Sequence, residues 1–125
     1  MREREHILEA AANYQRYQRL LDGGDPDWAL TLLFYSAVHL VQACAEQEAT
    51  RPGSPPAPAN HGERLDYVAN RLARVFTAYR TLQEASEDAR YDLVKRTEDE
   101  VRRFHDNEYR RLREGLQQRG LEFQT

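Results

Sequence analysis

The fold of this 125-residue chain is decided by WALTLLFYSAVHLVQACA, residues 28 to 45, its most apolar stretch. As a helix over residues 27–48 it has almost no polar face, because apolar side chains occupy nearly every direction: Trp28, Leu32, Tyr35, Val38, Leu40 and Val41. A helix that is apolar nearly all round belongs at the centre of a bundle or against a partner chain. The stretch includes Thr31, Ser36, His39 and Gln42 and falls short of the roughly 20 apolar residues that cross a bilayer. We therefore interpret it as a buried helix and expect no membrane segment.

The flanking sequence predicts further helices. Residues 4–21 carry apolar side chains at helical spacing up to Gly23-Gly24, and Asp25-Pro26 is typical of the start of the next helix. Asn60 with Glu63 predicts a helix over 60–83, and TEDE at 97–100 predicts a last helix that ends before Gly120. Residues 85–95 fit either a helical turn or a loop. We expect an all-α, up-and-down bundle of four to five helices.

Residues 50–60 form the one clear loop of the sequence. Four of the five prolines lie there, which favours an extended, solvated segment. The segment is too short to separate two stable domains, and 125 residues suit one. We predict a single domain over residues 1–125 with a proline-rich loop at 50–60.

The charge and cysteine content restrict the partners and the compartment. The formal net charge is −3, so no global positive field attracts nucleic acid. The first 60 residues carry five arginines and eight acidic residues, whereas residues 61–125 carry 13 basic and 13 acidic residues. Any basic surface is therefore expected to be a local patch in the second half of the chain. Cys44 is the only cysteine, and the charged N-terminus is not followed by an apolar signal segment. These features predict a cytoplasmic protein.

The four histidines offer few catalytic patterns. His39 lies in the apolar helix, where it is either a buried, hydrogen-bonded side chain or a general base in a cleft. His105 lies among the mixed charges of the last helix, which are more typical of a solvated face than of a nucleic-acid surface. Glu3 and His6 make one Glu-x-x-His pair without a second, so we expect no metal site and no cofactor.

Two short groups could bind phosphate. His61 and Arg64 flank the start of the helix after the loop, where a helix N-terminus can receive an anion, although they can equally be ordinary helix-start residues. The second group is predicted to lie outside a regular helix and comprises Arg90, Tyr91, Lys95 and Arg96. These side chains could bind a phosphate and stack a base, or they could have a structural role.

Five motifs, in order, resemble the HEPN superfamily of small helical domains over residues 27–116. They are DWA at 27–29, LFYSAVHL at 33–40, HGER at 61–64, SEDARYD at 86–92 and TEDEV at 97–101. The resemblance implies a bundle of four or five helices that often forms a homodimer. It also implies either a ribonuclease or a non-catalytic module that accompanies nucleotidyltransferases or toxin–antitoxin systems, or binds nucleotides.

The ribonucleases of that superfamily carry Arg, then four to six residues, then His, and no such pair occurs here. We therefore expect a non-catalytic, dimeric HEPN-like module that binds a nucleotide, RNA or a protein partner. An atypical metal-independent ribonuclease that uses His39, His61, Arg90 or His105 is the first alternative. A scaffold protein or the neutralising partner of a toxin is the second.

Overall fold

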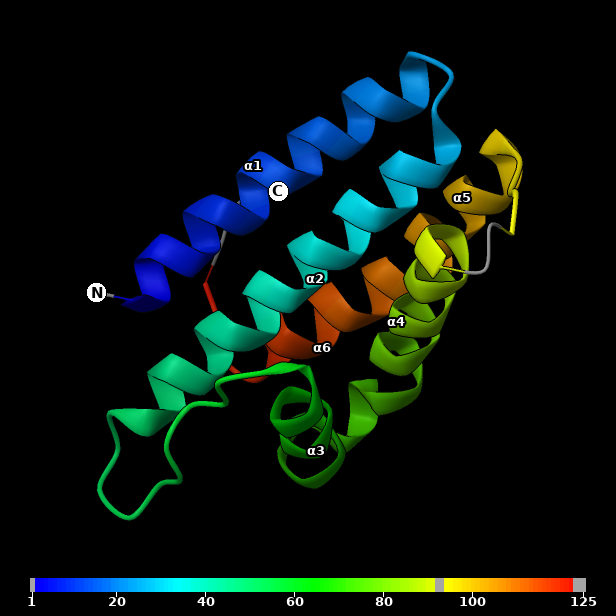
Figure 1. Ribbon diagram of the computed structural model, residues 1–125. Helices are drawn as coiled ribbons and strands as arrows, with labels where there is room; N and C mark the ends of the chain where they lie inside the picture. The colour runs from blue at the N-terminus through cyan, green and yellow to red at the C-terminus, as the bar shows by residue number, and fades with distance from the viewer. Residues whose placement is uncertain (1, 92–93, 123–125) are drawn as a thin grey trace.

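The computed structural model describes residues 2–91 and 94–122, and these residues form helices without a strand among them (Figure 1). The elements are α1 (Arg2–Asp22), α2 (Pro26–Ala49), α3 (His61–Arg71), the 3₁₀ turn η1 (Ala73–Val75), α4 (Phe76–Tyr91), α5 (Glu98–Phe104), the π-helical turn η2 (His105–Tyr109) and α6 (Arg110–Gln118). Because α5, η2 and α6 follow one another without a break, they act as one helix, and the described chain has five. The all-α prediction is confirmed.

Helix α2 lies at the centre, with α1 along one side and α4 and α5–α6 along the other (Figure 1). Its length and composition would suit a membrane span, but 78% of its apolar window is buried inside the bundle, as expected of a core helix. Leu33, Phe34 and Val41 are fully buried. Trp28, in the first turn of α2, is 58% exposed in the single chain.

The predicted helix starts are confirmed by their caps. Asp25 accepts a hydrogen bond from the backbone N–H of Trp28 at 3.3 Å, directly before Pro26. Asn60 accepts from the N–H of Glu63 at 2.8 Å. Thr97 accepts from the N–H of Glu100 at 3.1 Å, and the Glu100 carboxylate accepts from the N–H of Thr97 at 2.8 Å. These bonds satisfy amide groups that the first helical turn would otherwise leave unpaired.

The prediction of one helix over 60–83 is wrong. The chain leaves helical geometry at Leu72 (φ −129°, ψ 44°), passes through η1 and restarts as α4, which continues to Tyr91. The turn at Leu72, which is 3% exposed, folds both halves onto the same core.

The extended α4 also corrects the prediction that Arg90 and Tyr91 lie outside a regular helix, because both occupy the last turn of α4. The undecided segment 85–95 is therefore helical up to residue 91, and residues 92 and 93 lie outside the described residues. No helix crosses residues 50–60. The end of this segment is fixed to α2, because Gln42 Nε2 donates to the Pro58 carbonyl at 2.9 Å.

A buried carboxylate fastens α3 and the C-terminal segment to α2. Glu48 accepts a hydrogen bond from the Tyr67 hydroxyl at 2.6 Å and forms an ion pair with Arg71. Arg119 lies 3.7 Å from the same carboxylate. Hydrogen bonding by Arg71, against the opposing effect of burial, holds the pKa of Glu48 below its usual range.

We expect Glu48→Gln to lower the urea midpoint of unfolding at pH 7. In acid, the variant and the parent should unfold at the same urea concentration. Because the pKa of Glu48 is lower in the folded chain than in the unfolded chain, the carboxylate stabilises the fold above its unfolded pKa. That contribution disappears as the pH falls through the folded pKa. Urea titrations at pH 7 and pH 3.5 measure the change. Glu114→Gln, on the exposed face of α6, is the control and should match the parent at both pH values.

Candidate functional site

Three of the predicted phosphate contacts come together beside α2. His61 is the first residue of α3, Arg64 lies one turn further on, and Arg90 lies in the last turn of α4. Partial desolvation, then Arg64, then Arg90 lower the pKa of the His61 imidazole, and Glu87 opposes them, so both guanidinium groups act on one ring. We refer to His61, Arg64 and Arg90 as the cationic cluster.

The cationic cluster is held in place by uncharged groups. Arg64 donates from Nη1 to His61 Nδ1 at 3.0 Å and from Nε to Gln42 Oε1 at 3.0 Å. Arg90 donates from Nη1 to the Tyr35 hydroxyl, and its guanidinium lies 5.4 Å from the centre of the Tyr35 ring. Because a guanidinium can only donate, His61 Nδ1 has to accept, which leaves the proton on Nε2 and makes that atom a further donor.

The two arginines of the cationic cluster lack a direct counter-ion among the described residues, although the Glu87 carboxylate acts on His61. Among the residues that the structure describes, neither Arg64 nor Arg90 forms an ion pair. Eight of the other fifteen arginines do pair with an Asp or Glu: Arg2, Arg16, Arg71, Arg80, Arg96, Arg102, Arg110 and Arg119. Two half-buried cations with hydrogen-bonded side chains and no counter-ion make a site suited to an anion.

The remaining predicted phosphate contacts lie elsewhere or at the edge. Lys95 Nζ lies 3.4 Å from Asp27, and Arg96 lies 3.6 Å from Asp88 with its guanidinium 5.1 Å from the Phe104 ring centre. The charges of these two side chains are therefore already matched by acids. Tyr91 is 73% exposed, and its ring centre lies 5.1 Å from the Arg90 guanidinium.

His39 contacts α1 rather than an open cleft. Its Nδ1 lies 2.9 Å from Nδ1 of His6, and the two rings are stacked with centroids 5.2 Å apart. Burial lowers the pKa of both imidazoles. One nitrogen of the contact has to donate and the other accept, so the pair cannot carry a proton on both nitrogens without losing this bond. Within the described residues, no three His, Cys, Asp or Glu side chains converge to hold a metal ion.

We expect the His6–His39 pair to make the fold less stable as the pH falls below about 6.5. The pKa values are lower in the folded chain than in the unfolded chain, so the unfolded chain takes up more protons in this range. His39→Gln should therefore flatten the dependence of the melting temperature on pH between 7 and 5. An unchanged slope in the variant would contradict this origin of the acid sensitivity.

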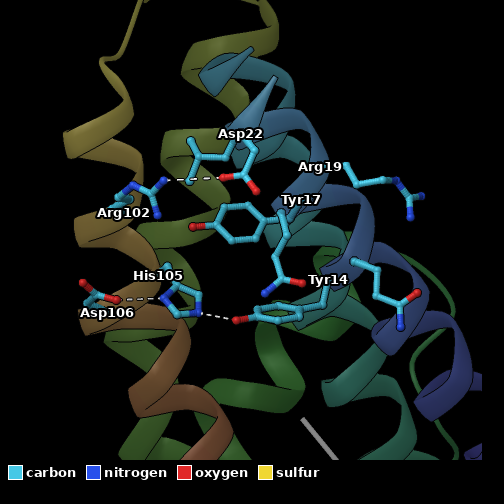
Figure 2. A pocket seen from close by; sticks show the side chains of 10 residues that line it. Tyr14, Tyr17, Arg19, Asp22, Arg102, His105 and Asp106 are labelled. Carbon is cyan, nitrogen blue, oxygen red and sulfur yellow. Dashed lines mark hydrogen bonds and ion pairs between the residues drawn. The ribbon is translucent and has the colours of Figure 1, made fainter. Parts of the chain in front are cut away.

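A second polar site lies in a hollow of about 670 Å³ between α1 and the α5–η2 segment (Figure 2). His105 Nδ1 lies 2.8 Å from Asp106 Oδ1, and His105 Nε2 lies 2.8 Å from the Tyr14 hydroxyl. The carboxylate can only accept, so Nδ1 donates and Nε2 accepts from the phenol. Arg102, which also lines the hollow, pairs with Glu98 at 2.6 Å and Asp22 at 3.7 Å.

The π-helical turn η2 gives this hollow its geometry. It runs from His105 to Tyr109, and the Tyr109 hydroxyl lies 2.8 Å from Ser36 Oγ of α2 in the core. His105 stacks against Tyr17 of α1 with ring centres 5.6 Å apart. The interpretation of this segment as a solvated face does not hold at His105, whose side chain is only 25% exposed. No local pattern signals the contact, because Tyr14 and His105 are 91 residues apart.

Comparisons with known proteins do not assign the chain to a family: no protein-family model matches it, and no curated protein matches its sequence. The described residues form five helices, with the cationic cluster on α3 and α4 and hydrogen bonds that link Tyr14 of α1, His105 and Asp106 of η2.

Proposed function

We propose that the protein is a non-catalytic, HEPN-like helical module that binds a phosphate-bearing ligand, a nucleotide or RNA, at the cationic cluster. One observation carries the proposal: among the described residues Arg64 and Arg90 form no ion pair, and both act on His61 more strongly than Glu87 does. A bound anion would supply the direct counter-ion that these two arginines lack among the described residues.

Local geometry supports phosphate in particular. The cluster lies at the N-terminus of α3, an 11-residue helix whose first-turn amides and dipole favour negative charge. Arginine presents a planar fork of donors that matches phosphate oxygens. The exposed ring of Tyr91 next to Arg90 offers a surface on which a base can stack.

We also propose that the module acts as a homodimer in the cytoplasm. The large apolar side chains that stay exposed supply candidate surfaces for a second copy or for a protein partner: Leu8, Trp28, Tyr91 and Val94. Sedimentation equilibrium would measure the stoichiometry, and a monomer at high concentration would contradict the dimer.

Isothermal titration with nucleoside monophosphates and with a short single-stranded RNA tests the binding proposal. We expect saturable binding that weakens as salt rises, because charge contributes to it. Lys95→Gln should bind as the parent does, since Lys95 is paired with Asp27 and lies outside the cluster. Failure of every phosphate-bearing ligand to bind would refute the proposed function.

A metal-independent ribonuclease is the second candidate, favoured by the Tyr14–His105–Asp106 chain in the hollow. If Tyr14 released His105 Nε2, that nitrogen could accept the 2′-hydroxyl proton, and Arg102 could stabilise the phosphate charge after leaving Glu98 and Asp22. Incubation of the chelator-treated protein with mixed RNA tests it beside His105→Ala. Cleavage by the parent that His105→Ala abolishes would favour this candidate over the non-catalytic module.

A further inference from the structure

We infer that Tyr14 is a reactive tyrosine that takes an acyl group from an ester, a modification site distinct from the anion site proposed on α3 and α4. The Tyr14 hydroxyl lines the hollow between α1 and η2, where it contacts a histidine that a carboxylate orients (Figure 2). A weak nucleophile within hydrogen-bond reach of a base, itself oriented by a third group, is the arrangement by which proteins activate nucleophiles. The inference does not depend on nucleotide binding.

The three side chains form one continuous hydrogen-bonded chain. The Tyr14 hydroxyl donates to His105 Nε2 at 2.8 Å, so the nitrogen that would take the phenolic proton already contacts this group. His105 Nδ1 donates to Asp106 Oδ1 at 2.8 Å, which keeps Nε2 free to accept and favours the imidazolium once it forms. Stacking against Tyr17, with ring centres 5.6 Å apart, also fixes the imidazole. Transfer of the phenolic proton therefore needs no rearrangement of the hollow.

The atoms and charges of the acylation balance. The Tyr14 oxygen attacks the carbonyl carbon of the ester, and its proton passes to His105 Nε2. The new C–O bond leaves a negative charge on the former carbonyl oxygen. The carbonyl forms again as the bond to the leaving oxygen breaks, and the leaving oxygen takes the proton from His105. The products are acylated Tyr14 and an alcohol or phenol.

The Tyr17 hydroxyl can stabilise the negative charge that develops on the carbonyl oxygen. It lies in the same hollow, between Arg102 and His105 (Figure 2). Burial, and then the nearby Tyr14, raise the pKa of Tyr17 to about 12, whereas Arg102 opposes them. The Tyr17 hydroxyl therefore stays protonated at pH 7 and can donate to an oxyanion formed beside Tyr14.

The size and charge of the hollow favour an acyl group over a phosphoryl group. Its volume of about 670 Å³ admits a small ester. The charged lining residues are two of each sign: Arg19, Arg102, Asp22 and Asp106. Arg102 is already paired with Asp22 and with Glu98 outside the lining, and the Asp106 carboxylate next to His105 would repel a negatively charged phosphoryl donor. A neutral ester meets no such repulsion.

Incubation of the full chain with p-nitrophenyl acetate, followed by peptide mass spectrometry over time, tests the inference. We expect Tyr14 to be acetylated at least about 100-fold faster than Tyr91, because a positioned general base is typically worth that factor or more. Tyr91 is the internal reference, since it is 73% exposed and contacts the Arg90 guanidinium rather than a histidine.

His105→Ala should reduce the acetylation rate of Tyr14 to that of Tyr91. Imidazole added to the buffer should restore part of the rate in this variant, which a purely structural role of His105 would not produce. His61→Ala is the matched control, because it removes an imidazole from the cationic cluster instead of the hollow, and it should leave the acetylation of Tyr14 unchanged.

The outcomes are distinct from those of the nucleotide titrations. Acetylation of Tyr14 no faster than that of Tyr91 would overturn the inference and leave the anion site standing. Fast acetylation that persists in His105→Ala would overturn the role of His105 as the base. Loss of nucleotide binding with fast acetylation of Tyr14 would refute the proposed function and support the reactive tyrosine.

Discussion

The double variant Arg64→Gln, Arg90→Gln is expected to weaken the binding of a nucleoside monophosphate by at least about 100-fold, because each arginine supplies a charge-assisted hydrogen bond worth about 1.5 kcal/mol or more. Neither side chain forms an ion pair in the described chain, so glutamine leaves no carboxylate without its partner and the fold should persist. Isothermal titration gives the affinities, and circular dichroism checks that the variant is folded.

A charge-matched control separates a specific site from general attraction. Arg80→Gln, Arg110→Gln removes the same two charges from exposed ion pairs on α4 and α6. We expect this control to bind the nucleotide almost as tightly as the parent in moderate salt, where distant charges are screened. Equal losses in the two double variants would contradict a localised phosphate site.

Gly115→Val is expected to destabilise the fold by about 3 kcal/mol, at the upper end of the usual cost of overfilling a packed interior. Gly115 of α6 lies against η1, where a Cβ would overlap the side chain of Val75. Val75 is itself buried, so relief requires the 3₁₀ turn to move with it. Chemical denaturation of parent and variant measures the difference.

Two further variants identify the cause of that loss. Adding Val75→Ala to Gly115→Val should recover part of the stability, because the smaller side chain makes room for the new one. Gly62→Ala is the matched control, since a Cβ there would meet only Asn60 Oδ1, at 3.4 Å, and it should change stability little. A Gly115→Val variant as stable as the parent would contradict the close approach of α6 to η1.

Much of the fold could be predicted because its signals are local. The caps at Asp25, Asn60 and Thr97 depend on side chains within three residues, and the central position of α2 follows from its own composition. The break at Leu72 left no such signal. The apolar spacing of Leu65, Val68, Leu72 and Val75 continues through it, because a single 3₁₀ turn hardly alters helical periodicity.

The candidate sites were predictable only where their residues are neighbours in sequence. His61 and Arg64 lie one helical turn apart, so their contact could be predicted. The approach of Arg90 to Tyr35 depends on the turn at Leu72 and on the length of α4, neither of which the sequence indicated. The pairs His6–His39 and Tyr14–His105 depend on how α1 packs against other helices. The HEPN-like resemblance stays a prediction.

The most direct test of the account uses the four histidines as reporters, because His6, His39, His61 and His105 lie at three separate places. Imidazole resonances of labelled protein would be followed by NMR over pH, with and without adenosine 5′-monophosphate. We predict that the ligand raises the pKa of His61, because a bound anion favours the imidazolium. The ligand should not change the imidazole resonances of His105. A ligand-dependent shift at His105 with none at His61 would contradict this prediction and place binding in the hollow between α1 and η2.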